Sequence, residues 1–82
     1  MQRVIDQLIL TRDDLEGNIK ELMLENKIKK EIIDECQDEY RVQLMREDVE
    51  DNEFSMDDFK ETIFEINQVV EMLSVANELS KK

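Results

Sequence analysis

The chain has 82 residues, with 22 acidic side chains, 11 basic ones and a formal net charge of −11. Such a surface repels the phosphates of nucleic acids and of anionic membranes, so we expect no direct nucleic-acid partner and no membrane. A protein with a basic surface is the natural electrostatic complement. The absence of histidine excludes histidine-based catalysis and metal sites, and the single glycine excludes a glycine-rich phosphate loop. We therefore expect no enzymatic activity and no cofactor.

Composition also bears on the type of chain and on its compartment. Charged and hydrophobic residues each make up 40% of the sequence, which is too apolar for simple disorder and typical of long helices. The lone Cys36 cannot form an internal disulfide, and no apolar run approaches the roughly 20 residues of a membrane span. The first residues do not resemble a signal peptide. These features favour a cytoplasmic protein.

Alternating steps of three and four residues between apolar side chains predict a first helix over residues 4–48. This spacing keeps the side chains on one face, which must be buried against another helix. Arg12 and Lys29 are charged residues at positions where the pattern calls for apolar ones. Asn26 either fixes the register of a two-stranded coiled coil or lies exposed in an imperfect pattern. The predicted oligomer seam consists of Ile5, Leu8, Leu15, Ile19, Leu22, Asn26, Ile33, Cys36 and Tyr40.

Gly17 is the weak point of this first helix, because a glycine inside a helix costs about 1 kcal/mol relative to alanine. Two arrangements remain open. Either one long helix tolerates Gly17, or a short helix over residues 2–10 precedes a longer one that begins near Thr11. The heptad phase is kept from Leu8 to Leu22, which favours the single helix.

An acidic turn is predicted over residues 49–55. Clustered like charges disfavour a helix, and Ser55 has the sequence context of an N-cap. The heptad frame that contains Ile5 also differs by two residues from the frame that contains Met56, which argues against one continuous coiled coil. The acids proposed for partner binding are Glu47, Asp48, Glu50, Asp51, Glu53, Asp57 and Asp58.

A calcium loop in this acidic segment is not expected. In a loop starting at Asp48, Glu53 stands where glycine is needed and Phe59 stands where glutamate is needed.

A second helix is predicted over residues 56–80. At about 1.5 Å per residue it would span roughly 35–40 Å, against roughly 65–70 Å for the first helix. It would thus cover only the C-terminal half of the first helix, with its core side chains near Ile32, Ile33, Tyr40 and Leu44. The predicted bundle core consists of Phe59, Ile63, Ile66, Val70 and Leu73.

The predicted fold is therefore all-α, with one helical domain over residues 1–82. A long helix is followed by a shorter antiparallel helix, and the resulting helical hairpin dimerises as a coiled coil or four-helix bundle. Dimerisation would bury the projecting half of the first helix.

The function predicted from the sequence is a non-catalytic, self-associating interaction module, an adaptor or assembly factor that binds a protein partner through acidic surfaces. One alternative is an inhibitor that mimics nucleic acid, and another is a subunit that folds with a different helical partner. Residues 1–54 contain 16 of the 22 acids but also eight of the 11 bases. This mixture argues for ordinary solvation of helix faces rather than mimicry.

Overall fold

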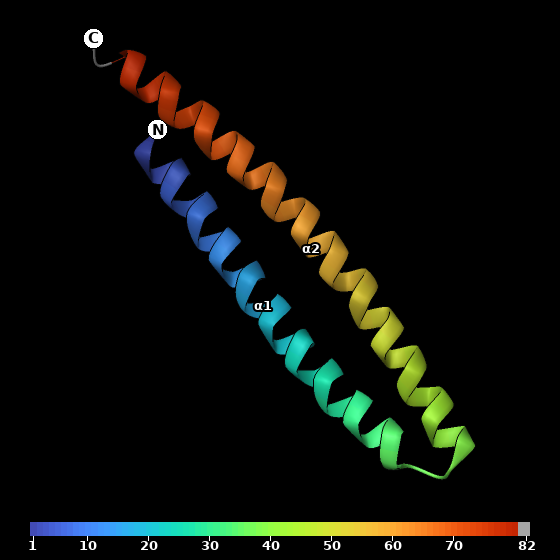
Figure 1. Cartoon of the computed structure of the whole chain (residues 1–82). Helices are drawn as coiled ribbons and strands as arrows, with labels where there is room; N and C mark the ends of the chain where they lie inside the picture. Colours follow the sequence, from blue (N-terminus) through green and yellow to red (C-terminus); the bar gives the residue numbers. More distant parts are fainter. Residues whose placement is uncertain (81–82) are drawn as a thin grey trace.

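The computed structural model describes residues 1–80, and Lys81 and Lys82 lie outside the described residues. Within this range the chain forms two α-helices, α1 (Gln2–Glu35) and α2 (Glu39–Ser80). They run antiparallel and pack against each other, so the N-terminus lies beside the C-terminal end of α2 (Figure 1). The predicted all-α helical hairpin is confirmed. Neither helix of the described chain has a stretch long and apolar enough to cross a membrane.

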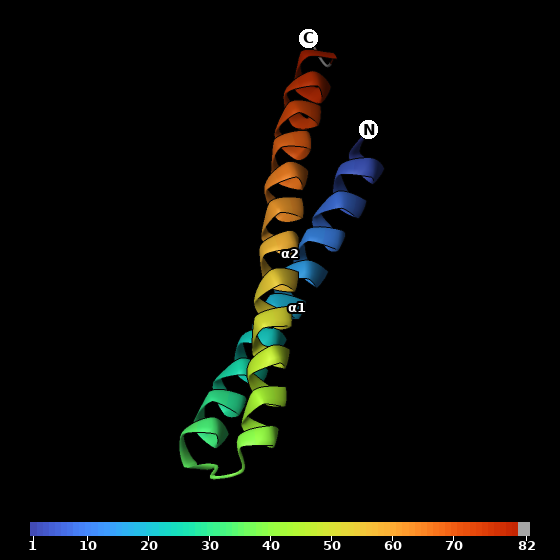
Figure 2. The same ribbon diagram turned by 90° about the vertical axis from the view of Figure 1, so that its right-hand side faces the viewer.

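The hairpin is a rod rather than a globule. Its Cα atoms extend over 67 × 14 × 13 Å, and its radius of gyration is 18.8 Å, against about 12 Å for a compact domain of this length. The helices cross at a shallow angle, with α1 passing from one side of α2 to the other along the rod (Figure 2). This crossing agrees with the gradual wrapping that a seven-residue apolar repeat imposes on a helix pair.

The predicted helix boundaries are wrong. The first helix ends at Glu35 instead of residue 48, and residues 49–55 belong to the uninterrupted helix α2. The chain turns at residues 36–38. Consequently α2, with 42 residues, is longer than α1, with 34, so the expected order of a long helix and a shorter one is reversed. Ser55 lies inside α2 and caps no helix.

The phase difference between the two heptad frames is real, but it falls at residues 36–38. When the frame of Met56 is extended toward the N-terminus, Asn52, Val49, Met45 and Val42 occupy its a and d positions, and all four are buried or half-buried. Tyr40, which was assigned to the earlier frame, lies beyond the turn and is 73% exposed. The two-residue difference between the heptad frames of Ile5 and Met56 therefore does mark a turn, but Tyr40 belongs after the turn and not to the frame of Ile5.

The acidic segment stays helical because its apolar side chains are covered by α1 while its carboxylates stay exposed, and two of them, Asp48 and Glu53, form ion pairs with Lys29 and Lys30 of α1. All seven predicted acids are exposed, whereas Val49 and Met56 are buried and Asn52 is half-buried. A like-charge pair on a helix surface costs about 0.2–0.5 kcal/mol. Burying a valine or methionine side chain contributes about 1.5–3 kcal/mol. Packing against α1 therefore outweighs the repulsion between neighbouring carboxylates.

The turn is built from side-chain capping instead of glycine or proline. Cys36 is extended, with φ −84° and ψ 133°, and its N–H donates to the carbonyl oxygen of Ile33 at 3.3 Å. The Oδ1 atom of Asp38 accepts hydrogen bonds from the backbone N–H groups of Tyr40 at 3.1 Å and Arg41 at 3.4 Å. Asp38 is thus the N-cap of α2.

Gly17 does not interrupt α1, which confirms the single continuous helix over this part of the chain. A Cβ atom at Gly17 would meet no other atom within 4 Å. The glycine therefore serves no close approach between α1 and α2, and its cost to the helix is tolerated.

The capping roles of Asp38 and Ser55 predict opposite results for alanine substitution. Asp38→Ala should lower the free energy of unfolding by about 0.5–2 kcal/mol, because two backbone N–H groups lose their acceptor. Ser55→Ala should be neutral or slightly stabilising, since alanine has the higher helix propensity. Urea denaturation at one fixed protein concentration measures both variants. A larger loss for Ser55→Ala than for Asp38→Ala would contradict the position of the turn.

Candidate interaction surfaces

The predicted seam of the first helix faces α2 of the same chain. From Ile5 to Cys36, every a and d position of α1 is buried or half-buried, while nearly all other positions of that helix are exposed. The residues were correctly placed on one face, with Tyr40 as the exception, but their expected pairing with a second copy is not what the structure shows. The physical reason is the early turn, which makes α2 long enough to cover all of α1.

The predicted bundle core of the second helix also lies in this interface, yet against different residues. Phe59, Ile63, Ile66, Val70 and Leu73 are all buried or half-buried on the face of α2 that meets α1. A hydrogen bond from Arg12 to Asn67 places this part of α2 beside the N-terminal half of α1. The expected neighbours Ile32, Tyr40 and Leu44 are instead 45%, 73% and 45% exposed.

The apolar core is thin. Among the described residues, only Ile5, Val49, Met56 and Ile66 are buried hydrophobic side chains, with exposed fractions between 4% and 9%. Two packed helices can surround few side chains completely, so most seam residues keep one flank in solvent. Much of the apolar surface of the chain therefore stays exposed.

An asparagine pair lies in the middle of the interface. Asn26 is only 5% exposed. The Nδ2 atom of Asn52 donates to Oδ1 of Asn26 at 2.8 Å and to Oε2 of Glu25 at 2.8 Å. The Nδ2 atom of Asn26 donates to the carbonyl oxygen of Val49 at 3.5 Å. Asn26 therefore fixes the register, and the alternative of an exposed Asn26 is wrong.

Arg12 is the first of two basic side chains that replace apolar seam residues of α1. Its Nη1 atom donates to Oδ1 of Asn67 at 3.1 Å, and Nη2 lies 3.4 Å from Oδ1 of Asp13. Its Nε atom is buried without a hydrogen-bond partner, which costs free energy. Arg12 therefore favours one register of α1 against α2 more than it stabilises the hairpin.

Lys29 is the second basic side chain in the seam. Its Nζ atom lies 3.2 Å from Oε1 of Glu25 and 3.4 Å from Oδ2 of Asp48. The hydrogen bond to Glu25, supported by Asp48, raises the pKa of Lys29 above its ordinary value of 10.5. A raised pKa means that the stabilisation is fully present below the unfolded pKa and is lost as the pH rises through the folded one. Lys29 therefore stays charged and paired at neutral pH.

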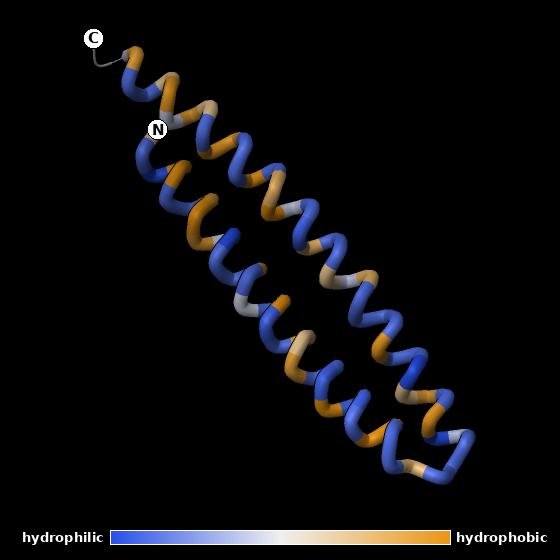
Figure 3. Tube along the Cα trace, in the orientation of Figure 1, coloured by the Kyte–Doolittle hydropathy of each residue, from blue (hydrophilic) through white to orange (hydrophobic). Residues whose placement is uncertain are grey.

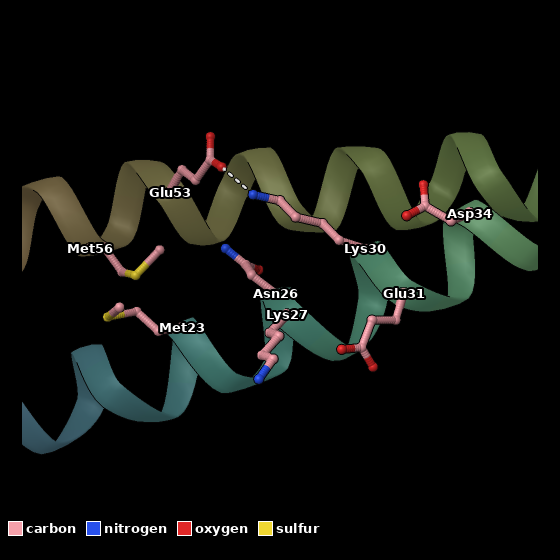
Figure 4. Close-up of a pocket in the computed structure, with 8 residues that line it drawn as sticks. All are labelled: Met23, Asn26, Lys27, Lys30, Glu31, Asp34, Glu53 and Met56. Carbon is pink, nitrogen blue, oxygen red and sulfur yellow. Dashed lines mark ion pairs between the residues drawn. The ribbon is translucent and has the colours of Figure 1, made fainter.

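A surface groove of about 430 Å³ opens beside the asparagine pair (Figure 4). The sulfur atoms of Met23 and Met56 point into it from opposite helices, and Lys30 and Glu53 close one side with an ion pair of 3.6 Å. Lys27, Glu31 and Asp34, all on α1, line the rest of the groove. Within residues 1–80, no three cysteine, aspartate or glutamate side chains are grouped to hold a metal ion.

The predicted partner-binding acids lie on the outside of α2 rather than in a loop. Glu50, Glu53 and Asp57 line a small depression together with Phe54, which is 65% exposed. Asp48 and Glu53 also form ion pairs with lysines of α1. The structure thus combines negative charge with an exposed aromatic ring on one helix surface. The sequence pattern identified the charges, whereas it did not identify Phe54 as part of this surface.

Many large apolar side chains remain exposed on both helices. Hydrophobic residues recur along the whole length of each helix (Figure 3). On α1 they include Leu24, Ile28 and Ile32, which follow one another at steps of four residues and are 60%, 49% and 45% exposed. Toward the C-terminal end of α2 they include Val69, Met72, Val75 and Leu79, which are between 43% and 70% exposed. Exposed apolar side chains grouped in this way are typical of interaction sites.

No known protein family, curated protein or solved structure matches the chain.

The asparagine pair generates a double-mutant prediction. Asn52→Leu alone should lower the free energy of unfolding by about 1–3 kcal/mol, because it leaves the buried amide of Asn26 with an unmet partner. Asn26→Leu together with Asn52→Leu should restore or exceed the original stability, since an apolar pair replaces the polar one. Urea denaturation of the two single variants and the double variant gives the coupling energy. Strictly additive effects would show that the two amides do not act as a pair.

Proposed function

We propose that the chain is a non-catalytic helical interaction module that self-associates into a four-helix bundle. The observation that carries this proposal is the exposed apolar surface, which remains on both helices after the seam between them is filled. The accessible surface of 6604 Å² exceeds the roughly 5,200 Å² of a compact monomer of this mass by about 1,400 Å². A stable protein interface needs about 800 Å² from each partner. One copy therefore carries enough surplus surface for a stable contact.

The thin core supports the same proposal. A chain of this size is marginal without disulfides, metals or oligomerisation, and two helices bury few side chains completely. Packing two hairpins together would cover the exposed rows of both copies. The alternative of a different helical partner would use the same rows, so the mass of the purified protein distinguishes between the two. A cytoplasmic location also belongs to this proposal and rests on the lone Cys36.

Self-association predicts a molecular mass that corresponds to two chains. Sedimentation equilibrium of the purified protein at micromolar concentration should give twice the mass of 9.8 kDa. The thermal midpoint of the helical circular dichroism signal should rise with protein concentration, because association is linked to folding. A stable, fully helical monomer with a concentration-independent midpoint would overturn the proposal.

We further propose that the acidic surface around Phe54 binds a protein segment that carries both basic and apolar side chains. The exposed ring supports this partner over a nucleic-acid-binding protein that expects phosphates, since phosphate mimicry has no use for an aromatic side chain at the centre of the acids. A basic amphipathic helix would place its apolar residues on Phe54 and its lysines beside Glu50 and Asp57.

Neutralising the acids next to Phe54 should slow binding of such a segment. The triple variant Glu50→Gln, Asp51→Asn and Asp57→Asn should lower the association rate with a synthetic lysine- and leucine-containing amphipathic peptide, and should flatten its salt dependence. Stability should stay unchanged or rise slightly, because like-charge repulsion is relieved. Stopped-flow fluorescence at several salt concentrations measures the rates.

A matched control changes the same number of charges elsewhere on α2. The variant Glu61→Gln, Glu65→Gln and Glu71→Gln removes three negative charges without touching the surroundings of Phe54. If the control slows association as much as the first variant does, the effect is general charge attraction, and the surface around Phe54 is not a binding site.

A further inference from the structure

The end of the rod where the two chain ends meet carries an exposed apolar surface. On α2, exposed apolar side chains follow one another at steps of three, four and three residues, which keeps them on one face of the helix. Val4 of α1 is exposed beside them. This terminal patch consists of Val4, Val69, Met72, Ala76 and Leu79, and its large side chains are between 43% and 70% exposed.

The terminal patch lies on one side of the hairpin and is free of carboxylates. In the heptad frames of Ile5 and Met56, all its residues occupy c or g positions, which share one side of an antiparallel helix pair. The acids of residues 1–11 and 66–80 are Asp6, Glu71 and Glu78, and all three occupy b positions, on the other side. In a chain with 22 acids, this end of the rod therefore offers an apolar surface without like charges.

Nearer the turn, the same side of the hairpin is acidic. Its c and g positions carry one base, Arg41, and eight acids: Asp14, Glu21, Glu25, Glu35, Asp48, Asp51, Asp58 and Glu65. Two copies that met along the whole of this side, in either direction, would bring these carboxylates together, which is unfavourable. The terminal patch is the part of this side on which two copies can meet without opposing like charges.

We infer that two copies of this chain join by their terminal patches alone, in the antiparallel orientation, so that the rods overlap at their chain ends and their turns point in opposite directions. The inference rests on the proposed self-association and adds its surface and its direction. The four-helix bundle is then confined to the overlap, and the acidic parts of the two rods stay apart.

The spacing of the terminal patch on α2 matches itself in this orientation. Steps of three, four and three residues read the same in both directions, so a two-fold axis level with Ser74 places Val69 of one copy on Leu79 of the other. The same axis places Met72 on Ala76. A large side chain meets a smaller one in each pair, and a depression of about 430 Å³ beside Ala76 can receive the methionine.

Val4 brings α1 into the same contact. The hydrogen bond of Arg12 to Asn67 fixes which residues of the two helices lie level. Val4, eight residues before Arg12, therefore lies level with residues 74–75 of α2, beside the axis. An axis that crosses the rod from α1 to α2 sets each helix against the same helix of the second copy, so the two Val4 side chains meet.

The overlap ends before the acids begin. With the axis level with Ser74, residues 68–80 of the two copies lie side by side, and Glu65 and Asp14 lie outside the overlap. No carboxylate on this side is buried without a partner, which would be costly. The chain ends close the longest loop of a single hairpin, so the contact supports the part of the rod that has the least support of its own.

The overall length of the dimer tests the arrangement. From the turn to Ser74, α2 extends about 54 Å, so the dimer should have a maximum dimension of about 110 Å by small-angle X-ray scattering. Two copies paired along their whole length would stay close to the 67 Å of one hairpin. Sedimentation equilibrium of the same sample keeps the two proposals apart. A dimer of the shorter length overturns the arrangement alone, and a monomer overturns self-association as well.

Two matched charge substitutions test the surface. Met72→Glu should raise the dissociation constant of the dimer about tenfold or more, because an unpaired carboxylate is costly to bury. Ile28→Glu adds the same charge at another c position of this side, where the side chain is 49% exposed. It should leave the dissociation constant unchanged, because Ile28 lies outside the overlap. Sedimentation equilibrium over a range of concentrations measures both constants, and equal losses would overturn the inference.

A mixture of two variants tests the contact of Met72 with Ala76. Ala76→Lys alone should also dissociate the dimer, since a lysine then faces the apolar Met72 of the other copy. Equal amounts of Met72→Glu and Ala76→Lys chains should restore a dimer, because the glutamate of one chain faces the lysine of the other. Circular dichroism verifies that each variant is helical. A mixture of helical chains that stays monomeric would overturn the inference.

Discussion

The pairing of two seven-residue repeats across antiparallel helices is the constraint from which the remaining features follow. Once the chain turns at residues 36–38, each a or d position of α1 has one possible neighbour on α2. The bonds of Asn26 to Asn52 and of Arg12 to Asn67 report this register in the middle and near the chain ends. The seam uses only two positions in seven on each helix. Apolar residues at the other positions stay exposed, and they are the basis of the proposed self-association.

The polar side chains in the seam lower the stability of the hairpin but allow only one register between α1 and α2. An interface of leucine and isoleucine alone would bury more apolar surface, but it would pair almost equally well after a slip of one heptad. Such a slip would separate Asn26 from Asn52 and Lys29 from Asp48. It would leave buried polar groups without partners, and each of them costs about 1–3 kcal/mol. These side chains therefore specify the hairpin more than they stabilise it.

The sequence predicted the two apolar stripes, the antiparallel helical hairpin and the polar position of Asn26, because these depend on local periodicity. It did not reveal the turn, because Cys36, Gln37 and Asp38 include neither glycine nor proline, while the acidic segment carried several signals of a turn. Those signals were weaker than the packing of Val49 and Met56. The partner of Asn26 could not be predicted either, since the residue opposite Asn26 depends on where the chain turns. The spacing from Met56 back to Val42 was the signal that located the reversal.

The place of the polar pairs along the rod has a consequence for how the hairpin forms. Contacts next to the turn close the shortest loops and lose the least chain entropy, so pairing starts there and proceeds toward the chain ends. Lys29 and Asn26 lie in the half of α1 nearer the turn. A wrong register is therefore rejected while few residues are ordered. Ile5 and Leu73, at the far end, close the longest loop and separate first, so amide hydrogen exchange should be fastest where the two chain ends meet.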